Sequence, residues 1–359
     1  MSTINHGANL FDLEKKYGFK KEEMMDFSSN INPFGASQKA LKAISENPQI
    51  VSIYPDPHYK ILKESISHYS RANIDNIILG NGATSLISGF IKEVAPKNAL
   101  VLSPAYSEYK KELEKIDSKI FELILKPEEN FLTSSEEIIE KAKATESTLI
   151  VICNPNNPTG TILDRESIRK IASSINGYIM VDETYIEFTD KCLYSSSELC
   201  DEIPNLFVIR GTSKFFSTPG LRLGYGIISD KKIKSSLEKY TSLWGINIFA
   251  DIMGSLMFTD ELYQRDTYKN ICKERTFLID SLSSFNDLKV YPSFGNFILC
   301  EIKTKKIKAK DLYKSLIKDK IIIRNCESFQ GLSEYYFRVC TLKRQENEYL
   351  IDKLSLYLK

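Results

Sequence analysis

Residues 208–226 read VIRGTSKFFSTPGLRLGYG, and this stretch joins two short apolar runs through a loop that carries a lysine. Lys214 lies among small and hydroxylated residues, whereas a surface lysine usually lies among other charged and long polar side chains. Arg222 follows the turn PGL and could close an anion site. The ordinary alternative is a lysine that extends its charged end into solvent from the start of a helix. The rest of the chain decides between these two interpretations.

Short apolar runs like these two recur along the first two thirds of the chain, between segments with helical spacing. Each run is bounded by Gly, Pro, Asn or Asp and is nearly continuous in apolar character, which is typical of strands buried on both faces. We therefore predict an α/β fold whose large domain holds a mostly parallel sheet. The predicted strands are IDNIILG (74–80), NALVLS (98–103), STLIVIC (147–153), GYIMVDE (177–183), NLFVIR (205–210) and LGYGIIS (223–229).

The pattern changes beyond about residue 255. Strand-like runs such as DLKVYP, GNFILCEI, IIIRNC and YYFRVCT alternate there with helical segments, which indicates a smaller α+β domain. We predict three parts. They are an N-terminal segment (1–40) that closes over the site and packs with the small domain, a large domain (41–255) and a small C-terminal domain (256–359).

Composition narrows the classes of function. The 359 residues include 48 Lys and Arg against 47 Asp and Glu, a net charge of +1, so we expect neither a nucleic-acid nor a membrane partner. The 7 cysteines form no C-x-x-C pair and no zinc spacing, so we expect no metal and reduced thiols. No apolar run reaches a membrane-spanning length. These features predict a cytoplasmic protein.

Unusual polar residues follow four of the predicted strands. Ligands in α/β sheets bind beyond the carboxyl ends of the strands, so these residues predict one shared site. They occur in GNGATS (80–85), NPNNPTG (154–160), DETY (182–185) and RGTSK (210–214).

Each of these motifs also has a simpler interpretation. The backbone N–H groups of Gly82, Ala83 and Thr84 could cradle a phosphate at a helix start, but an ordinary turn with Thr84 as the N-cap would look the same. The two prolines around Asn157 restrict a loop that could aim this side chain inward, or the loop could simply be tight. Asp182 ends a buried strand, where an unpaired carboxylate is costly, although a helix cap is possible.

One cofactor accounts for all of these motifs together. Pyridoxal 5′-phosphate needs an amine for its aldehyde, an acid beside its ring nitrogen, a donor for its phenolate oxygen and a phosphate cup. A desolvated lysine near another cation has a lowered pKa, which suits this chemistry. We predict that the amine is Lys214, the acid Asp182 and the donor Tyr185 together with Asn157, and that the cup consists of Gly82, Ala83, Thr84, Ser213 and Arg222.

The order and spacing of these residues resemble those of fold-type I pyridoxal enzymes, the aspartate aminotransferase superfamily. Within it, IYPDPHY (53–59) is similar to the Y-P-D motif of the histidinol-phosphate aminotransferase branch. This resemblance implies a homodimer in which Tyr54 reaches the cofactor phosphate of the neighbouring subunit. It also implies that Tyr106, in SPAYSEY, stacks on the pyridoxal ring.

A narrower resemblance is to the threonine-phosphate decarboxylases, a family of the cobalamin pathway. It rests on HGANL (6–10), DFSSNINPFG (26–35), SKFFSTPGLRLGY (213–225), IIIRNCESFQGL (321–332) and YYFRVCTLKRQENEYL (335–350). The resemblance implies decarboxylation of L-threonine O-3-phosphate to (R)-1-aminopropan-2-ol O-phosphate, for the nucleotide-loop linker of cobalamin. The chain departs from its relatives at Gly211, usually Ser or Thr, for which Thr212 and Ser213 could compensate.

The resemblance also suggests how the substrate is held. Two guanidinium groups suit a dianionic phosphate better than a single carboxylate. We expect Arg324, Arg338, Asn30 and His6, with Asn157, to hold the phosphate of a small phosphorylated amino acid and to leave its carboxylate free to depart. Otherwise, the two arginines could pair with surface acids and His6 could be a surface residue near the terminus.

Three other functions remain open at this point. A histidinol-phosphate aminotransferase or related class I/II aminotransferase would share every cofactor residue. An L-serine O-phosphate decarboxylase would differ in its substrate by one methyl group. A cofactor-binding regulatory domain without turnover is the third, although the sequence carries no DNA-binding module beside it.

Overall fold

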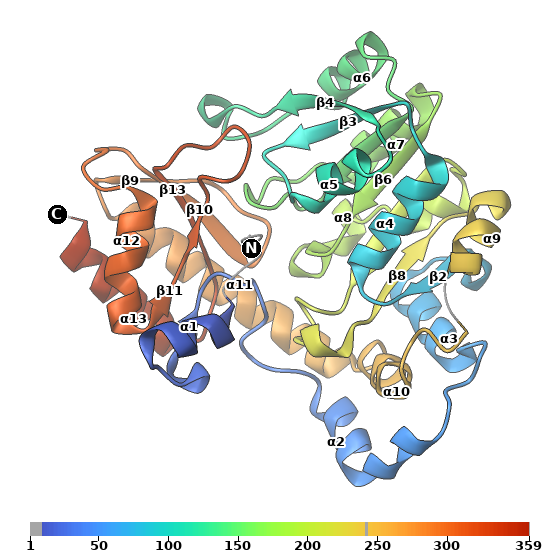
Figure 1. Ribbon diagram of the computed structural model, residues 1–359, viewed down its shortest axis with the longest axis horizontal. Helices are drawn as coiled ribbons and strands as arrows, with labels where there is room; N and C mark the ends of the chain where they lie inside the picture. The colour runs from blue at the N-terminus through green and yellow to red at the C-terminus, as the bar shows by residue number, and fades with distance from the viewer. Residues whose placement is uncertain (1–8, 241–242, 359) are drawn as a thin grey trace.

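The computed structural model describes residues 9–240 and 243–358, and a seven-stranded sheet lies at the centre of the large domain (Figure 1). The strand order is β2-β8-β7-β6-β5-β3-β4. The strands from β7 to β4 pair in parallel, and β8 lies antiparallel to β2 and β7, so the predicted α/β class with a mostly parallel sheet is confirmed. The strands are β2 (Ile77–Gly80), β3 (Asn98–Ser103), β4 (Lys119–Ile124), β5 (Leu149–Cys153), β6 (Tyr178–Asp182), β7 (Leu206–Gly211) and β8 (Gly224–Ile227).

Apolar side chains cover both faces of this sheet, which explains the continuous apolar runs in the sequence. One core layer packs against α4, α5 and α9, and the other faces α3, α6, α7 and α10. The helices of the large domain are α2 (Gln38–Glu46), α3 (Lys60–Ser70), α4 (Ala83–Val94), α5 (Glu108–Glu114), α6 (Ser135–Ala144), α7 (Arg165–Ser174), α8 (Lys191–Tyr194), α9 (Lys231–Tyr240) and α10 (Ile248–Met257).

A four-stranded antiparallel sheet forms the small domain, in the order β12-β13-β10-β9. The helix α11 runs from the large domain and packs on β9, β10 and α13. The predicted boundary after residue 255 falls inside α10, which packs on α2 and α3. The elements are β9 (Leu288–Val290), β10 (Phe297–Ile302), β12 (Arg324–Asn325), β13 (Tyr336–Cys340), α11 (Glu261–Ser283), α12 (Ala309–Leu316) and α13 (Arg344–Tyr357).

The N-terminal segment packs with the small domain before it crosses to the large one. After α1 (Leu10–Tyr17), β1 (Met25–Asp26) pairs in parallel with β11 (Ile321–Ile322), and Met24 joins an apolar cluster with Ile317. The run IIIRNC, predicted as one strand, is therefore divided. Its first half pairs with β1, and its second half is β12, which pairs with β13.

Within the described ranges, no helix combines the length and the apolar character that a membrane crossing requires.

Candidate active site

A cavity of about 320 Å³ lies between the carboxyl ends of the large-domain strands and the small domain. Loops after β5, β6 and β7, the start of α4, the N-terminal segment, and β12 and β13 all contribute to its wall. The structure therefore brings together residues that are far apart in the sequence. The predicted site residues that line the cavity are Ala83, Thr84, Tyr106, Asn157, Asp182, Tyr185, Ser213, Lys214, Arg222, Arg324 and Arg338.

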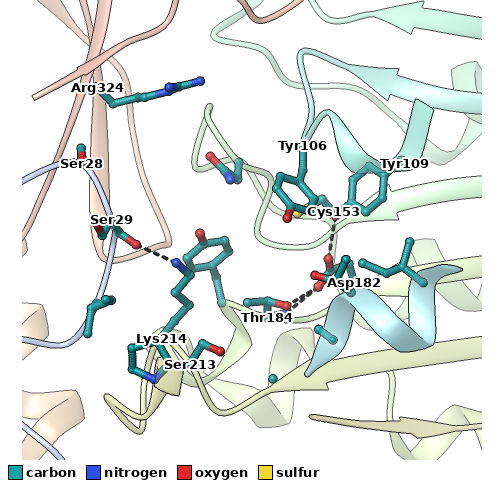
Figure 2. Close-up of a pocket in the computed structure, with 18 of the residues that line it drawn as sticks. Ser28, Ser29, Tyr106, Tyr109, Cys153, Asp182, Thr184, Ser213, Lys214 and Arg324 are labelled. Carbon is teal, nitrogen blue, oxygen red and sulfur yellow. Dashed lines mark hydrogen bonds between the residues drawn. The ribbon is translucent and has the colours of Figure 1, made fainter. Parts of the chain in front are cut away.

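Lys214 lies in the loop after β7, and its amine is held inside the cavity. Its Nζ donates a hydrogen bond to the backbone carbonyl of Ser29 at 2.7 Å, and Figure 2 shows the side chain reaching toward that residue. Desolvation, followed by the positive charge of Arg338, lowers the pKa of Lys214 to about 8. More of the amine is therefore neutral near pH 7 than in an ordinary lysine, and the neutral form is the nucleophile.

Asp182, at the end of β6, lies on the other side of the cavity from Lys214 (Figure 2). It is 4% exposed, and burial raises the pKa of its carboxyl group. Three hydrogen bonds oppose that effect. The hydroxyl of Tyr109 donates at 2.7 Å, and Thr184 donates from its hydroxyl at 2.5 Å and its backbone N–H at 2.9 Å. The carboxylate is thus fixed in place for a cationic partner in the cavity.

Tyr106 and Tyr185 also line the cavity. Tyr106 packs edge-on against Tyr109 with ring centroids 5.5 Å apart, and burial raises the pKa of Tyr106 to about 12, so its hydroxyl stays protonated. Burial also raises the pKa of Tyr185. Nδ2 of Asn30 donates to the Tyr185 hydroxyl at 3.1 Å. Asn30 itself is 1% exposed and does not line the cavity, so it reaches the site through Tyr185.

The start of α4 provides one anion-binding end. No side chain caps this 12-residue helix, whose N-cap is Gly82 rather than the Thr84 of the simpler interpretation. Free N–H groups at a helix start attract anions. Gly82 has φ +79°, and a Cβ there would lie 2.4 Å from Nη2 of Arg222, so only glycine lets this arginine approach the turn.

Gly211 lines the same end of the cavity. A Cβ at this position would lie 3.4 Å from Cβ of Ala83. The hydroxyl of Thr212 donates to the carbonyl of Leu223 at 3.0 Å and is buried away from the cavity. The suggested compensation by Thr212 is therefore wrong, whereas Ser213 does line the cavity.

Two arginines provide the second anion-binding end. Arg324 in β12 and Arg338 in β13 are direct cross-strand partners. Like charges in such positions repel, and within the described residues neither arginine makes an ion pair with an acid. The alternative interpretation, in which the two arginines pair with surface acids, is therefore wrong for the described structure. The pair is suited to an anion that neutralises both charges.

Neutral contacts hold these guanidinium groups. Arg338 donates from Nη2 to the carbonyl of Ser28 at 2.6 Å and from Nη1 to Oδ1 of Asn157, and its buried Nε has no partner among the described residues. Arg324 donates to Oγ of Ser328 at 3.2 Å and lies over the ring of Phe329, 5.4 Å from its centroid. Both arginines therefore keep donors free for a ligand.

One predicted residue lies elsewhere in the described chain. Tyr54 is 74% exposed and stacks on Trp244 with ring centroids 4.2 Å apart, outside the cavity of its own chain. His6 lies outside the described residues. Sequence reasoning missed several lining residues, although SPAYSEY and DETY contained two of them. The missed residues include Ser28, Ser29, Tyr109, Cys153, Thr184 and Phe329.

The cavity has the parts that pyridoxal 5′-phosphate needs. An amine of lowered pKa and a fixed carboxylate face it, and an uncapped helix start with a glycine turn lies beside them. A second cationic end, at Arg324 and Arg338, lines the same cavity. The residues present thus fit the cofactor.

Comparison with known proteins places the chain in a family. The family model described as "Aminotransferase class I and II" matches residues 22–354. The chain belongs to this family. This assignment agrees with the order of the cavity residues along the sequence, which resembles that of the aspartate aminotransferase superfamily.

Two similar proteins align with nearly the whole length of this chain. A protein of Caldanaerobacter subterraneus subsp. tengcongensis, provisionally named a threonine-phosphate decarboxylase, is 35% identical over 99% of this chain and 94% of its own length. The adenosylcobalamin biosynthesis bifunctional protein CobDQ of Leptospira interrogans is 34% identical over 99% of this chain. The chain spans 41% of the length of that bifunctional protein.

A solved structure supports the fold. The histidinol-phosphate aminotransferase of Clostridium acetobutylicum superposes with a TM-score of 0.85 at 31% identity, covering 92% of this chain and 98% of the other.

Proposed function

We propose that this chain is a pyridoxal-phosphate-dependent decarboxylase that converts L-threonine O-3-phosphate to (R)-1-aminopropan-2-ol O-phosphate for cobalamin formation. The observation that carries the proposal is the pair Arg324 and Arg338, which are cross-strand partners without an acid in the described structure and face the cavity of Lys214. A phosphate dianion matches two guanidinium groups in charge. The names of the two similar proteins agree with this substrate and pathway.

The large domain would hold the cofactor. Lys214 would bond its aldehyde, Asp182 would pair with its protonated ring nitrogen, and Tyr185 with Asn157 would donate to its phenolate oxygen. When bound, the cofactor supplies an electron sink for a bond broken at the substrate Cα. The cofactor phosphate and ring would be held by Gly82, Ala83, Thr84, Ser213, Arg222 and Tyr106, and by Tyr54 of a second copy.

The anion-binding end of the cavity at Arg324 and Arg338 would decide which bond at the substrate Cα breaks. If Arg324 and Arg338 hold the substrate phosphate, the carboxylate is left without a cation and can leave as carbon dioxide. Lys214, whose lowered pKa lets its amine gain and lose a proton near neutral pH, would return a proton to Cα. Asn157 would position Arg338 and Asn30 would position Tyr185, while a phosphate contact from His6 stays a prediction.

Turnover without a keto acid tests the proposal. The purified protein with pyridoxal phosphate is given L-threonine O-3-phosphate, and carbon dioxide and the amine product are followed. We expect release over many turnovers. L-Serine O-phosphate lacks one methyl group, whose contact is worth about 1–3 kcal/mol, so it should react more slowly rather than fail.

Histidinol-phosphate transamination is the second candidate, because the solved structure with a TM-score of 0.85 is such an aminotransferase. It would use the same cofactor residues. Conversion of the cofactor to its amine form by histidinol phosphate, with no carbon dioxide from L-threonine O-3-phosphate, would favour this candidate and reject the first.

We also propose that the protein is a homodimer. Tyr54 and Trp244 stack at the surface, and their neighbours Val51, Ile53 and Leu243 are 63%, 57% and 67% exposed. An apolar surface of this kind marks an interface. A second copy would cover it, and Tyr54 would then lie near the cavity of that copy.

A further inference from the structure

Asp26 shapes the segment that follows it. Its Oδ1 accepts hydrogen bonds from the backbone N–H of Ser28 at 2.8 Å and from the hydroxyl of Ser28 at 2.6 Å, and its Oδ2 accepts one from the hydroxyl of Ser29. Ser28 is 2% exposed, so its N–H has little access to water if Asp26 is lost. One carboxylate thus satisfies three donors on two consecutive residues.

The turn directs two consecutive carbonyl groups at the two cations of the cavity. The carbonyl of Ser28 accepts from Nη2 of Arg338 at 2.6 Å. The carbonyl of Ser29 accepts from Nζ of Lys214 at 2.7 Å, a contact drawn in Figure 2. The conformation set by Asp26 therefore fixes the acceptors for both groups at once.

We name residues 26–32 the strap, because its two ends are attached to different domains. At one end, Phe27 donates from its N–H to the carbonyl of Ile322 at 2.9 Å and accepts at its own carbonyl from Cys340 at 2.8 Å. At the other end, Asn32 donates to the carbonyl of Lys214 at 3.0 Å and, through Nδ2, to that of Phe215 at 2.9 Å. The strap thus connects the β11 and β13 strands to the lysine loop.

We propose that Asp26 is a positioning residue, which folds the strap so that Ser28 and Ser29 hold Arg338 and Lys214 in a fixed relation across the cavity. The inference rests on the roles that the proposed function gives to those two residues. Asp26 itself does not line the cavity and acts through the strap. Its substitution should therefore affect both cations together.

Two substitutions separate geometry from charge. Asp26→Ala removes every acceptor, whereas Asp26→Asn removes the charge but keeps an oxygen for Ser28. Both remove the negative charge that raises the pKa of Lys214, so both should lower that pKa to a similar extent. A difference in Lys214 labelling or in kinetic constants between the two variants therefore reports a change in the conformation of the strap.

Labelling of Lys214 in the cofactor-free protein gives the first readout. The protein is pulsed with acetic anhydride, and acetylation of Lys214 is compared by mass spectrometry with that of the exposed Lys143 on α6. In Asp26→Ala we expect the Lys214 rate to rise about tenfold over that in Asp26→Asn, as one lost charge-assisted hydrogen bond predicts. Because this readout needs no substrate, it stands even if the proposed reaction is wrong.

Kinetics of the loaded enzyme give the second readout. Asp26→Ala should raise KM for the phosphorylated substrate and lower kcat, because Arg338 and Lys214 are both released, and Asp26→Asn should restore most of both. Ser134→Ala, which removes the capping box of α6, is the matched control for a loss of stability alone. Equal Lys214 labelling in Asp26→Ala and Asp26→Asn, at a melting temperature like that of Ser134→Ala, would overturn the inference.

A milder variant tests the inference if Asp26→Ala does not fold. Ser29→Ala removes one of the three donors to Asp26 and should raise Lys214 labelling by a smaller factor than Asp26→Ala. Unchanged labelling in a folded Ser29→Ala, together with an Asp26→Ala that does not fold, would likewise count against a positioning role.

Discussion

Opposing charges set the protonation of Lys214. Desolvation acts first and Arg338 second to lower its pKa to about 8, while Cys340 and Asp26 raise it and Arg222 lowers it. Desolvation, with the two cations, explains why the pKa of the amine lies below the ordinary lysine value although Asp26 is close by. The arginine proposed to bind the substrate phosphate thus also lowers the pKa of the amine.

Removing that arginine should raise the pKa of Lys214. A neighbouring positive charge disfavours the ammonium form, so Arg338→Gln should move the pKa from about 8 upward toward the ordinary lysine value. The measurement is the pH dependence of Lys214 acetylation in the cofactor-free protein, whose midpoint should shift to higher pH. A midpoint that stays in place or falls would show that Arg338 does not set this pKa.

At the residue scale, the sequence allowed the prediction of side chains with distinctive chemistry. Lys214 and Asp182 were predictable because few side chains supply an amine or an acid at such positions, whereas Arg324 and Arg338 were predicted from the resemblance to relatives. The carbonyl acceptors of Ser28 and Ser29 were not, since every residue has a carbonyl and only the folded strap aims these two.

A buried ion pair joins two neighbouring elements of the large sheet. Arg210 of β7 lies 2.9 Å from Glu183, which follows β6, and their side chains are 2% and 0% exposed. Hydroxyls of Ser195 and Ser197 accept from the same guanidinium. The pair anchors the ends of β6, which carries Asp182, and of β7, which precedes the loop of Lys214.

Breaking this pair should destabilise the fold. Glu183→Ala removes the nearer carboxylate and leaves the buried guanidinium with only Glu187, at 3.9 Å, so it should cost up to about 3–5 kcal/mol of unfolding free energy. Urea denaturation of the cofactor-free protein measures the loss. Glu136→Ala, which removes the exposed partner of Lys170, is the matched control and should change stability far less. Equal losses for the two variants would contradict this account of the buried pair.

At the element scale, burial decided what could be predicted. The fully buried strands β5 and β7 stand out as apolar runs, whereas the edge strand β4 is partly exposed, carries Lys119 and Glu122, and was missed. IIIRNC is one apolar run in sequence but pairs with two different sheets. Such a division depends on partners distant in the chain, which local patterns do not contain.

At the scale of the whole molecule, a shared site would make two inactive chains complement each other. Tyr54→Ala keeps Lys214, and Lys214→Ala keeps Tyr54, so a mixed dimer would hold one complete site. Co-refolding equal amounts should restore roughly a quarter of the wild-type rate, since half of the dimers are mixed and each has one of two sites. Mixtures that stay at the level of the separate variants would contradict a Tyr54 that acts across subunits.

The fate of the hydrogen at the substrate Cα tests the central claim most directly. L-Threonine O-3-phosphate deuterated at Cα is incubated with the enzyme and pyridoxal phosphate, and the products are analysed by mass spectrometry. Decarboxylation predicts an amine that retains the deuterium and gains one solvent hydrogen where the carboxylate left. Loss of the deuterium to solvent, with the cofactor recovered in its amine form and no carbon dioxide released, would contradict the account and identify a transaminase.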